Sequence, residues 1–299
     1  MNAAEGAVAV VTGATGGMGR VIALDLARRG MRVVTIARDP RRAEDLRREA
    51  EQSTGTLEVI CGDLSHRDGV ISAAEAIRAR HSRVAVLVNN AGAHYAQRRL
   101  SRDGIEMHVA VDYLAAYGLT VLLAPQLRRG RARVVNVASD TLRDTRQVKL
   151  WGKPRPATLD TQHLQALTSL NGPRDFAPFE AYARAKLLTV TAGYALARAF
   201  DGEVTLNAVH PGIVATDIID DLVPAGLRPF GSLIRRTMLT PEQGAAAALR
   251  LATDPALREV TGRYFVRDTD TVTPSVSYDD DVQGRLRAVT DRFFGVGAV

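Results

Sequence analysis

The stretch Thr12-Gly13-Ala14-Thr15-Gly16-Gly17-Met18-Gly19 decides the fold of this chain. It directly follows Val8–Thr12, an apolar run of strand length, and leads into Met18–Arg29, which has a helical pattern. Glycines 13, 17 and 19 allow a tight turn, close approach of the backbone to a pyrophosphate and close packing of helix on strand. The helix N-terminus adds free N–H groups and the positive end of its dipole. A turn of this kind between a strand and a helix predicts dinucleotide binding.

Beyond this turn, short β-branched runs alternate with helical patterns, which is typical of a parallel sheet with crossover helices. The sequence therefore predicts an α/β chain with a single-domain Rossmann fold: three αβα layers around a mostly parallel, seven-stranded twisted sheet. The expected strands are Val8–Thr12, Arg32–Ala37, Leu57–Cys61, Val84–Val88, Arg133–Ala138, Val204–Val209 and Gly262–Val266. The expected helices are Met18–Arg29, Arg41–Gln52, Ala73–Arg80, Ile105–Leu127, Phe179–Phe200, Pro241–Ala252 and Asp279–Phe294.

The 299 residues, 46% of them hydrophobic, are enough to bury one full core, and we expect residues 1–299 to form one domain. No apolar run approaches the ~18 residues of a membrane-spanning helix. No basic region precedes the short apolar run at the N-terminus. These patterns predict a cytoplasmic protein without a membrane span. The single cysteine, Cys61, excludes an intramolecular disulfide and a cysteine-based metal cage; we expect it to be buried and predict no metal site.

The net charge of +6 invites comparison with nucleic-acid-binding proteins. However, the basic residues are scattered along the chain, and only three of them are lysines. An arginine bias of this kind is typical of a GC-rich genome, and we expect no nucleic-acid partner. The excess positive charge instead favours the approach of an anionic cofactor.

The end of the second expected strand indicates which nicotinamide cofactor is preferred. An acidic residue at this point would hydrogen-bond the ribose hydroxyls of NAD, whereas an arginine favours the 2′-phosphate of NADP. The sequence here is Ala37-Arg38-Asp39, and the planar guanidinium of Arg38 suits a phosphate. Asp39 leaves NAD open as an alternative, because its carboxylate could point toward the ribose instead. We expect NADP(H) to be favoured over NAD(H).

A tyrosine, a lysine and a serine supply the expected chemistry. Tyr182 and Lys186 are four residues apart on an expected helix, so their side chains emerge on one face. The pKa of a phenol is ordinarily about 10, and a neighbouring ammonium together with a positive nicotinamide ring would lower it. Tyr182 would then act as a general acid or base near neutral pH. Ser139, at the carboxyl end of the fifth strand, can hydrogen-bond the substrate oxygen beside Tyr182.

These features belong to an ordered set of motifs that covers nearly the whole chain. The set consists of the glycine turn, Asp63-Leu64, Asn89-Asn90-Ala91-Gly92, Ser139, Tyr182-Ala183-Arg184-Ala185-Lys186, and Pro211-Gly212 followed by Thr216. In this order, the motifs resemble those of the short-chain dehydrogenase/reductase family. The residue patterns at 104–120, 210–217 and 263–266 are most similar to those of the retinol-dehydrogenase-like and plant-reductase-like branches.

The resemblance implies a role for each matching position. Lys186 would also hydrogen-bond the nicotinamide ribose, and Asp63 would contact the adenine. Ile213 and Thr216 would hold the carboxamide of the nicotinamide. The expected cofactor-binding residues are Gly13, Thr15, Gly17, Met18, Gly19, Arg38, Asp63, Leu64, Asn90, Ala91, Gly92, Tyr182, Lys186, Pro211, Gly212, Ile213 and Thr216. The expected catalytic residues are Ser139, Tyr182, Lys186 and Asp112.

Asp112 stands where the family often has an asparagine, which is associated with a water-mediated proton relay to the lysine. An aspartate can hold the water as well, or it can pair directly with Lys186. A direct pair would favour the lysine cation and would partly cancel its field on Tyr182. Asp112 is therefore a candidate site residue whose proton relay departs from that of the family.

Two long segments interrupt the alternation of strands and helices. The first is an insertion at 140–178, where Trp151, Phe176 and Phe179 would either wall an apolar pocket or pack the insertion onto the body. The second, at 217–240, occupies the place of the family's substrate lid and would lay an apolar surface over the cofactor. Together they predict a medium-sized hydrophobic ketone, aldehyde or alcohol as the substrate. The insertion and the arginine bias suit specialised bacterial metabolism.

Two helices and the tail bear on the oligomeric state. The resemblance implies a homodimer or homotetramer formed through the helices around 105–127 and 180–200. Both helices are apolar, but packing in the core of a single chain would explain this equally well. The C-terminal helix and polar tail, 279–299, would instead cover the surface and keep the chain monomeric.

The sequence thus predicts an NADP(H)-dependent oxidoreductase that interconverts a carbonyl and an alcohol on a hydrophobic substrate, with hydride transfer at the nicotinamide. Two alternatives stay open. One is an enzyme with non-redox or redox-neutral activity on the same scaffold, which Asp112 and the insertion allow. The other is a catalytically silent NADP(H) sensor, a class that commonly lacks the tyrosine–lysine pair or the serine present in this chain.

Overall fold

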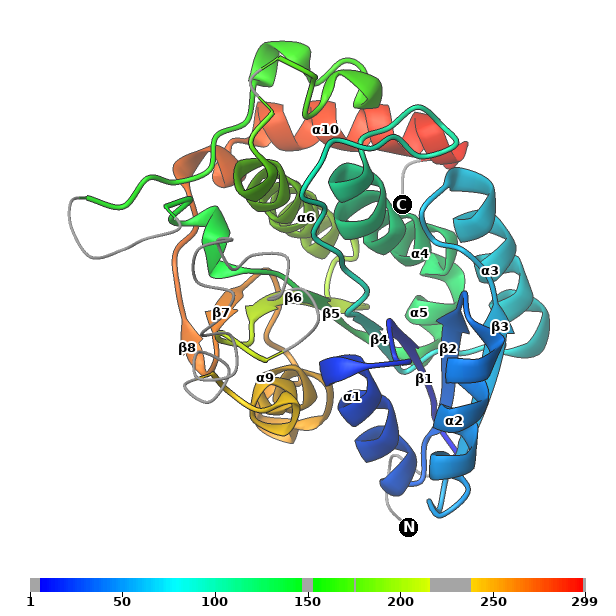
Figure 1. Cartoon of the computed structure of the whole chain (residues 1–299). Coiled ribbons are helices and arrows are strands. Elements are labelled where there is room, and N and C mark those ends of the chain that lie inside the picture. Colours follow the sequence, from blue (N-terminus) through cyan, green and yellow to red (C-terminus); the bar gives the residue numbers. More distant parts are fainter. Residues whose placement is uncertain (1–5, 147–152, 175, 216–237, 298–299) are drawn as a thin grey trace, which may run out of the picture.

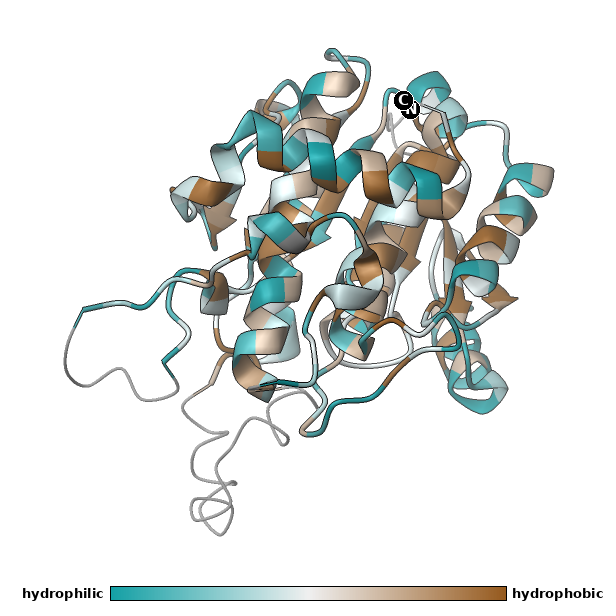
Figure 2. Ribbon diagram, turned by 90° about the horizontal axis from the view of Figure 1, so that it is seen from above, coloured by the Kyte–Doolittle hydropathy of each residue, from teal (hydrophilic) through white to brown (hydrophobic). Residues whose placement is uncertain are grey.

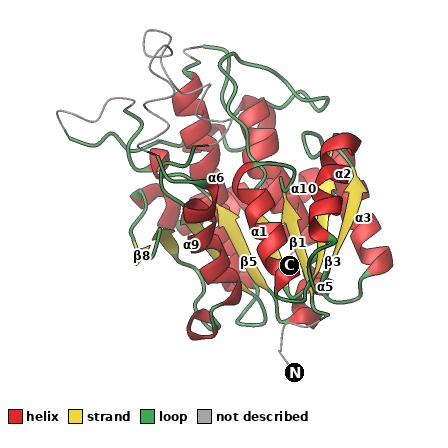
Figure 3. Cartoon of the chain, turned by 60° about the horizontal axis from the view of Figure 1, so that its bottom comes forward, coloured by secondary structure: helices red, strands yellow, loops and turns green. Residues whose placement is uncertain are grey.

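The structure is a computed structural model that describes residues 6–146, 153–174, 176–215 and 238–297. One sheet runs through these residues, with helices on both of its faces (Figure 1, Figure 3). The strands are β1 (Val8–Thr12), β2 (Arg32–Ala37), β3 (Thr56–Cys61), β4 (Val86–Asn89), β5 (Arg133–Val137), β6 (Thr205–His210), β7 (Tyr264–Val266) and β8 (Thr269–Asp270). The predicted α/β Rossmann fold is confirmed.

The strands follow the order β3-β2-β1-β4-β5-β6-β7-β8, and each neighbouring pair is parallel except β7 with β8. Val10 of β1 is paired with Val34 of β2 on one side and with Leu87 of β4 on the other. The seven expected strands are all present, and the antiparallel β8 is an addition to them. Because the strand order reverses between β1 and β4, a crevice forms at the carboxyl ends of these central strands.

The helices form two layers, each with its own hydrophobic core against the sheet. One layer contains α1 (Gly17–Arg28), α2 (Pro40–Ala50) and α9 (Pro241–Thr253). The other contains α3 (Arg67–Arg80), α4 (Ala115–Leu122), α5 (Ala124–Gly130), α6 (Pro178–Ala199) and α10 (Asp280–Phe294). Figure 2 shows mostly hydrophobic strands between helices of mixed hydropathy. The short helices are η1 (Val109–Leu114, a π-helix) and the 3₁₀ turns η2 (Asp140–Leu142), η3 (Thr161–His163), η4 (Leu167–Ser169), η6 (Pro255–Leu257) and η7 (Ser275–Tyr278).

The expectation of one long helix over 105–127 is wrong, because this segment is divided. Near its start, Glu106 forms an isolated β-bridge with Leu100, and the π-helical η1 precedes α4. Pro125 lacks an N–H, so the helix ends before it and restarts as α5. Among the described helices, none alone is long and apolar enough to span a membrane, and only Val109–Leu122 with Ala124–Gly130, bent by 64°, meets that test as a pair.

Two smaller expectations are corrected at the β3 edge of the sheet. Helix α3 begins at Arg67 rather than Ala73, because the His66 side chain accepts a hydrogen bond from Gly69 N–H and caps the helix. Cys61 is exposed rather than buried. It is the last residue of β3, which has a neighbouring strand on one side only.

Helix α10 packs against α6 and α3, and Figure 1 shows it lying across α6 and α4. The hydroxyl of Tyr117 donates to Asp291 at 2.7 Å, and a Cβ atom placed on Gly118 would lie 2.4 Å from Phe294 Cζ. The C-terminal helix therefore covers part of the helical surface through which the resemblance implied pairing of copies. The oligomeric state itself stays a prediction.

Candidate active site

A cavity of about 710 Å³ opens at the carboxyl ends of the central strands. Its wall includes the residues that directly follow β1, β2, β3, β4, β5 and β6. Of the expected site residues, it is lined by Gly13, Thr15, Gly17, Met18, Arg38, Asp63, Leu64, Asn90, Ala91, Gly92, Ser139, Tyr182, Lys186, Pro211, Gly212 and Ile213. Gly19 and Asp112 lie behind this wall, and Thr216 lies outside the described residues.

The glycine turn has the geometry that the sequence predicted. Gly13 has a φ of 68°, and a Cβ atom at this position would lie 2.9 Å from the Cα of Ala91. A Cβ on Gly19 would lie 2.2 Å from the Gly13 carbonyl oxygen, so this glycine serves the packing of α1 on β1 rather than the cavity wall. Among the described residues, no side chain caps the N-terminus of α1. The free N–H groups of its first turn therefore stay available for an anion.

Asn90 and Thr12 hold the loop after β4 against this turn. The Asn90 amide donates to the carbonyl oxygens of Thr12 and Gly13 at 3.0 Å and 3.3 Å. In return, the Thr12 hydroxyl accepts hydrogen bonds from the backbone N–H groups of Asn90 and Ala91. Asn90 thus both stabilises the loop and lines the cavity.

At the far end of the cavity, Arg38 and Arg42 lie in the wall together with Asp63. The Asp39 carboxylate is used elsewhere, because it caps α2 by accepting a hydrogen bond from Arg41 N–H at 2.9 Å. Burial works to raise the pKa of Asp63, but hydrogen bonds from Ser65 outweigh it and lower the pKa below its ordinary value. Arg42 was not among the expected site residues. Its signal in the sequence is its position four residues after Arg38, among the arginines that directly follow the second strand.

At the other end, Tyr182 and Lys186 project from the same face of α6. Lys186 Nζ lies 5.6 Å from the centre of the Tyr182 ring. It donates a hydrogen bond to the Val137 carbonyl oxygen at 3.0 Å and lies 3.1 Å from Asp112 Oδ1. Of the two arrangements open to Asp112, the structure has the direct ion pair.

The π-helical turn of η1 carries Asp112 to this position. Asp112 Oδ1 also accepts a hydrogen bond from Ala93 N–H at 3.2 Å, and a Cβ on Gly92 would lie 2.7 Å from the same oxygen. The second carboxylate oxygen, Oδ2, is buried and has no hydrogen-bond partner among the described residues. Asp112 therefore stands directly behind Lys186, as seen from the cavity.

The electrostatics of this cluster differ in one respect from the sequence expectation. Burial and the charge of Asp112 raise the pKa of Tyr182 above its ordinary value, although Lys186 and a hydrogen bond from Ser139 act to lower it. Burial alone would lower the pKa of Lys186, but the Asp112 carboxylate raises it, so the lysine stays a cation. The lowering influence of Lys186 is present as expected. In the protein without cofactor, however, burial and Asp112 outweigh it, and the pKa of Tyr182 is raised.

The insertion contributes to this site unevenly. Phe179, in the first turn of α6, lines the cavity. Phe176 instead stacks against His108, with ring centres 6.3 Å apart, and so packs the insertion onto the body. Trp151 and residues 216–237, most of the expected lid, lie outside the described residues. The sequence prediction missed Tyr95 and Arg146, which also line the cavity and belong to no motif spacing.

Comparison with known proteins agrees with this geometry. A family model described as short chain dehydrogenase matches residues 7–148. Polyprenol dehydrogenase from Mus musculus is 32% identical and aligns over 98% of this chain and 85% of its own length. Human retinol dehydrogenase 11 is 31% identical, over 87% of this chain and 77% of its own.

A solved structure of a bacterial reductase is also similar to this chain. The 3-oxoacyl (acyl-carrier-protein) reductase from Agrobacterium tumefaciens C58, with NADP bound, is 25% identical. It matches 88% of this chain and 93% of its own with a TM-score of 0.65. The chain therefore belongs to the short-chain dehydrogenase/reductase family of NAD(P)-dependent oxidoreductases, in its retinol-dehydrogenase-like branch.

Proposed function

We propose that this protein is an NADP(H)-dependent oxidoreductase that interconverts a carbonyl and an alcohol on a medium-sized hydrophobic substrate. The observation that carries the proposal is the continuity of one cavity. It extends from two arginines, Arg38 and Arg42, to Ser139, Tyr182 and Lys186. Its volume of about 710 Å³ falls within the range typical of ligand pockets.

The residues of the cavity fit a nicotinamide dinucleotide phosphate. The glycine turn leaves a backbone cradle that a Cβ at Gly13 would disturb, and the uncapped N-terminus of α1 offers N–H groups to a pyrophosphate. Arg38 and Arg42 present two cations to a 2′-phosphate, while Asp39 is committed to its helix cap. These three residues support NADP(H) over NAD(H). The bound nicotinamide would donate or accept the hydride.

Three side chains of the chain would manage the proton and the substrate oxygen. Tyr182 donates its phenolic proton to the forming alkoxide in the direction of reduction, and takes the proton back in the direction of oxidation. Ser139, which lines the same cavity as Tyr182, donates to the same substrate oxygen and stabilises its developing charge. Lys186 holds a positive charge beside the Tyr182 ring, since Val137 and Asp112 fix its ammonium group.

The cavity wall also supports a hydrophobic substrate. Apolar side chains from four separate segments share the cavity with Tyr182, namely Val111, Phe179, Ile213, Val214 and Met238. The two curated relatives described above are named for polyprenol and retinol, which are apolar alcohols. We therefore expect apolar aldehydes and their alcohols to be better substrates than polar ketones or sugars.

The proposal is tested by following the absorbance of NADPH and NADH in the presence of aldehydes and ketones of increasing apolar size. We expect turnover with NADPH, faster for apolar aldehydes than for polar ones. Tyr182→Phe should abolish turnover because it removes the acid, and it should change NADPH affinity little because the other expected cofactor-binding residues remain. NADPH binding without turnover on any carbonyl would favour the sensor, and product formation without net NADPH consumption would favour redox-neutral chemistry.

A further inference from the structure

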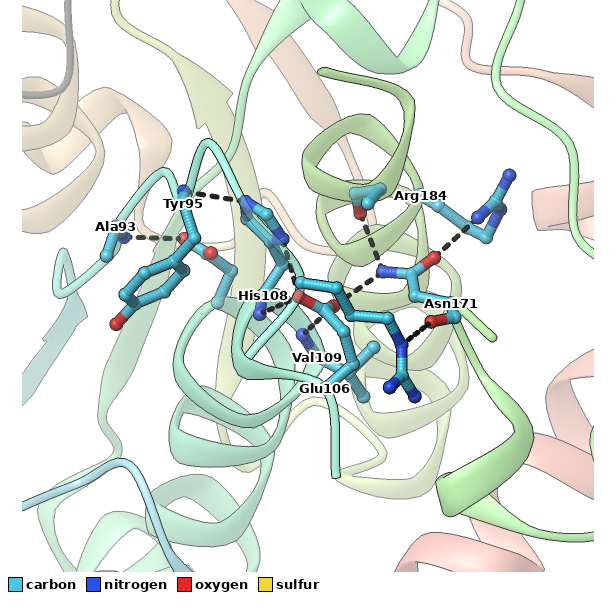
Figure 4. A network of polar contacts seen from close by, with 10 residues as sticks. Ala93, Tyr95, Glu106, His108, Val109, Asn171 and Arg184 are labelled. Atoms are coloured by element: carbon cyan, nitrogen blue, oxygen red, sulfur yellow. Dashed lines mark hydrogen bonds and ion pairs between the residues drawn. The ribbon is translucent and has the colours of Figure 1, made fainter. Parts of the chain in front are cut away.

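A buried polar network joins the insertion to the helix of Tyr182 and to the wall of the cavity (Figure 4). Its centre is Asn171, which is 5% exposed and has a φ of 53°, in the left-handed region that asparagine tolerates better than most residues. The Asn171 amide donates to Glu106 Oε2 at 2.8 Å and to the Ala181 carbonyl oxygen at 3.0 Å. Its Oδ1 accepts a hydrogen bond from Arg184 at 2.5 Å. The side chain thus uses both of its donors and its acceptor oxygen.

One branch of the network leads to the proposed general acid. Ala181 directly precedes Tyr182 in the first turns of α6, and in the part of the chain that the structure describes no side chain caps the start of this helix. The hydrogen bond from Asn171 therefore ties the beginning of α6 to the insertion. Arg184, one turn further along, is bound to the same asparagine and to the Thr158 carbonyl oxygen of the insertion.

The other branch leads through Glu106 and His108, both 0% exposed, to Tyr95 in the loop after β4. Tyr95 N–H donates to His108 Nε2 at 3.0 Å, so this nitrogen carries no proton. His108 Nδ1 then holds the hydrogen and donates it to Glu106 Oε1 at 2.8 Å. Burial works to raise the pKa of Glu106, but the hydrogen bonds from His108 and Asn171 outweigh it and lower the pKa, so Glu106 is a carboxylate.

The two branches meet around the Tyr182 ring. The His108 ring centre lies 6.1 Å from that of Tyr182, in an edge-on arrangement. Tyr95, whose backbone is held by His108, lines the cavity. A buried carboxylate with its partners is weak evidence for stability as such, because burying the charge costs about as much as its contacts return. The network instead holds α6 and the loop after β4 in a fixed position relative to each other.

We propose that Asn171 is a positioning residue of the active site, which sets the place of Tyr182 through Ala181 and the place of Tyr95 through Glu106 and His108. This inference rests on the proposed function, in which Tyr182 is the general acid. It gives part of the insertion at 140–178 a task in the reaction. Asn171 itself lies behind the cavity wall and touches no reacting atom.

The test is Asn171→Gly, which keeps the left-handed backbone and removes only the side chain. Asp201→Gly is the matched control, since Asp201 is exposed and has a φ of 45° just beyond the end of α6. Denaturant unfolding gives the folded fraction at the assay temperature, so that kcat can be expressed per folded molecule. NADPH affinity is measured by fluorescence, independently of turnover.

We expect Asn171→Gly to lower kcat per folded molecule by about 10- to 100-fold, because a small displacement of an acid is costly. Its Kd for NADPH should rise about 2- to 30-fold through the Tyr95 branch. Asp201→Gly should change neither quantity. An unchanged kcat per folded molecule in Asn171→Gly would overturn the inference and leave the asparagine a purely structural role.

A second variant covers the case in which Asn171→Gly does not fold. In Asn171→Asp combined with Glu106→Gln, donor and acceptor are exchanged, so the contact between the two residues is restored while Ala181 still loses its donor. We expect this double variant to bind NADPH about as tightly as the wild-type protein and to have a kcat about 10- to 100-fold lower; a wild-type kcat would overturn the inference. If the wild-type protein shows no turnover at all, the proposed function fails, and the NADPH affinity tests the inference by itself. An unchanged Kd in Asn171→Gly, or in Asn171→Asp alone if Asn171→Gly does not fold, would then overturn the inference.

Discussion

Replacing Asp112 with asparagine is expected to lower the pKa of Tyr182. Asp112 Oδ1 lies 3.1 Å from Lys186 Nζ, which in turn lies 5.6 Å from the centre of the Tyr182 ring. Together these distances place the carboxylate within about 9 Å of the ring centre. Two unit charges about 9 Å apart, at an effective dielectric constant of about 20, interact by about 2 kcal/mol, or roughly one pKa unit. Asparagine keeps the shape of the side chain and one oxygen for Lys186.

The assay is the pH dependence of kcat in both directions of the reaction. In carbonyl reduction Tyr182 must begin protonated, so activity is lost as the pH rises through its pKa. A lower pKa moves this loss to lower pH by roughly one unit. In alcohol oxidation Tyr182 must begin deprotonated, and the rise of activity should move to lower pH by the same amount. Asp201→Asn, which removes an exposed charge beyond α6, should leave both curves in place.

A curve that does not move in Asp112→Asn would refute this reasoning. Burial raises the pKa of Asp112, even though Lys186 beside it acts in the opposite direction. An unmoved curve would mean that burial prevails in the working enzyme and that Asp112 is already neutral there. A curve moved to higher pH would mean that the variant weakens the hold on Lys186 more than it removes the opposing charge.

Three further substitutions, the last with a control variant, test separate parts of the molecule. Arg38→Ser should weaken NADPH binding about 10- to 100-fold, because it removes a charge-assisted hydrogen bond, and should leave NADH binding unchanged in the same fluorescence titration. Ser139→Ala should lower kcat about 10²- to 10³-fold by removing a donor to the developing oxyanion, with little change in NADPH affinity. Gly118→Ala should lower the free energy of unfolding in urea by about 1–3 kcal/mol, because its Cβ would meet Phe294 in the packed core. Gly284→Ala, on α10 with open space around it, should instead stabilise the protein by about 0.5–1 kcal/mol; equal effects of the two alanines would contradict the packing of α10.

The parts of the site that the sequence predicted are those whose physical signal is local. A glycine turn between strand and helix, a residue at the end of a strand, and two side chains four apart on a helix each report their own position. For this reason Gly13, Ser139, Tyr182 and Lys186 were expected together at one edge of the sheet, and they line one cavity. The alternation of short apolar runs and helical patterns similarly predicted the order of strands and helices.

What the sequence did not predict depends on contacts between distant residues. Asn171 meets Glu106 across 65 positions of the chain, and nothing in its neighbours marks the meeting. The division of the segment 105–127 had a local signal in Pro125, but the run of apolar residues around it outweighed that signal in the prediction. The cap on α3 was missed because histidine is not among the usual capping residues.

Because Asp112 pairs directly with Lys186, the charges around Tyr182 differ from those in a site that has a neutral residue behind the lysine. Burial raises the pKa of Tyr182, and an ionised Asp112 raises it further by cancelling part of the opposing field of Lys186, so the phenol keeps its proton at neutral pH. That is the state in which Tyr182 must stand to donate a proton to a carbonyl. For the reverse direction, Tyr182 needs additional positive charge beside it, and an oxidised nicotinamide ring is a source of that charge. We therefore expect carbonyl reduction to run over a wide range below the pKa of Tyr182, and alcohol oxidation to favour alkaline pH more strongly than in Asp112→Asn.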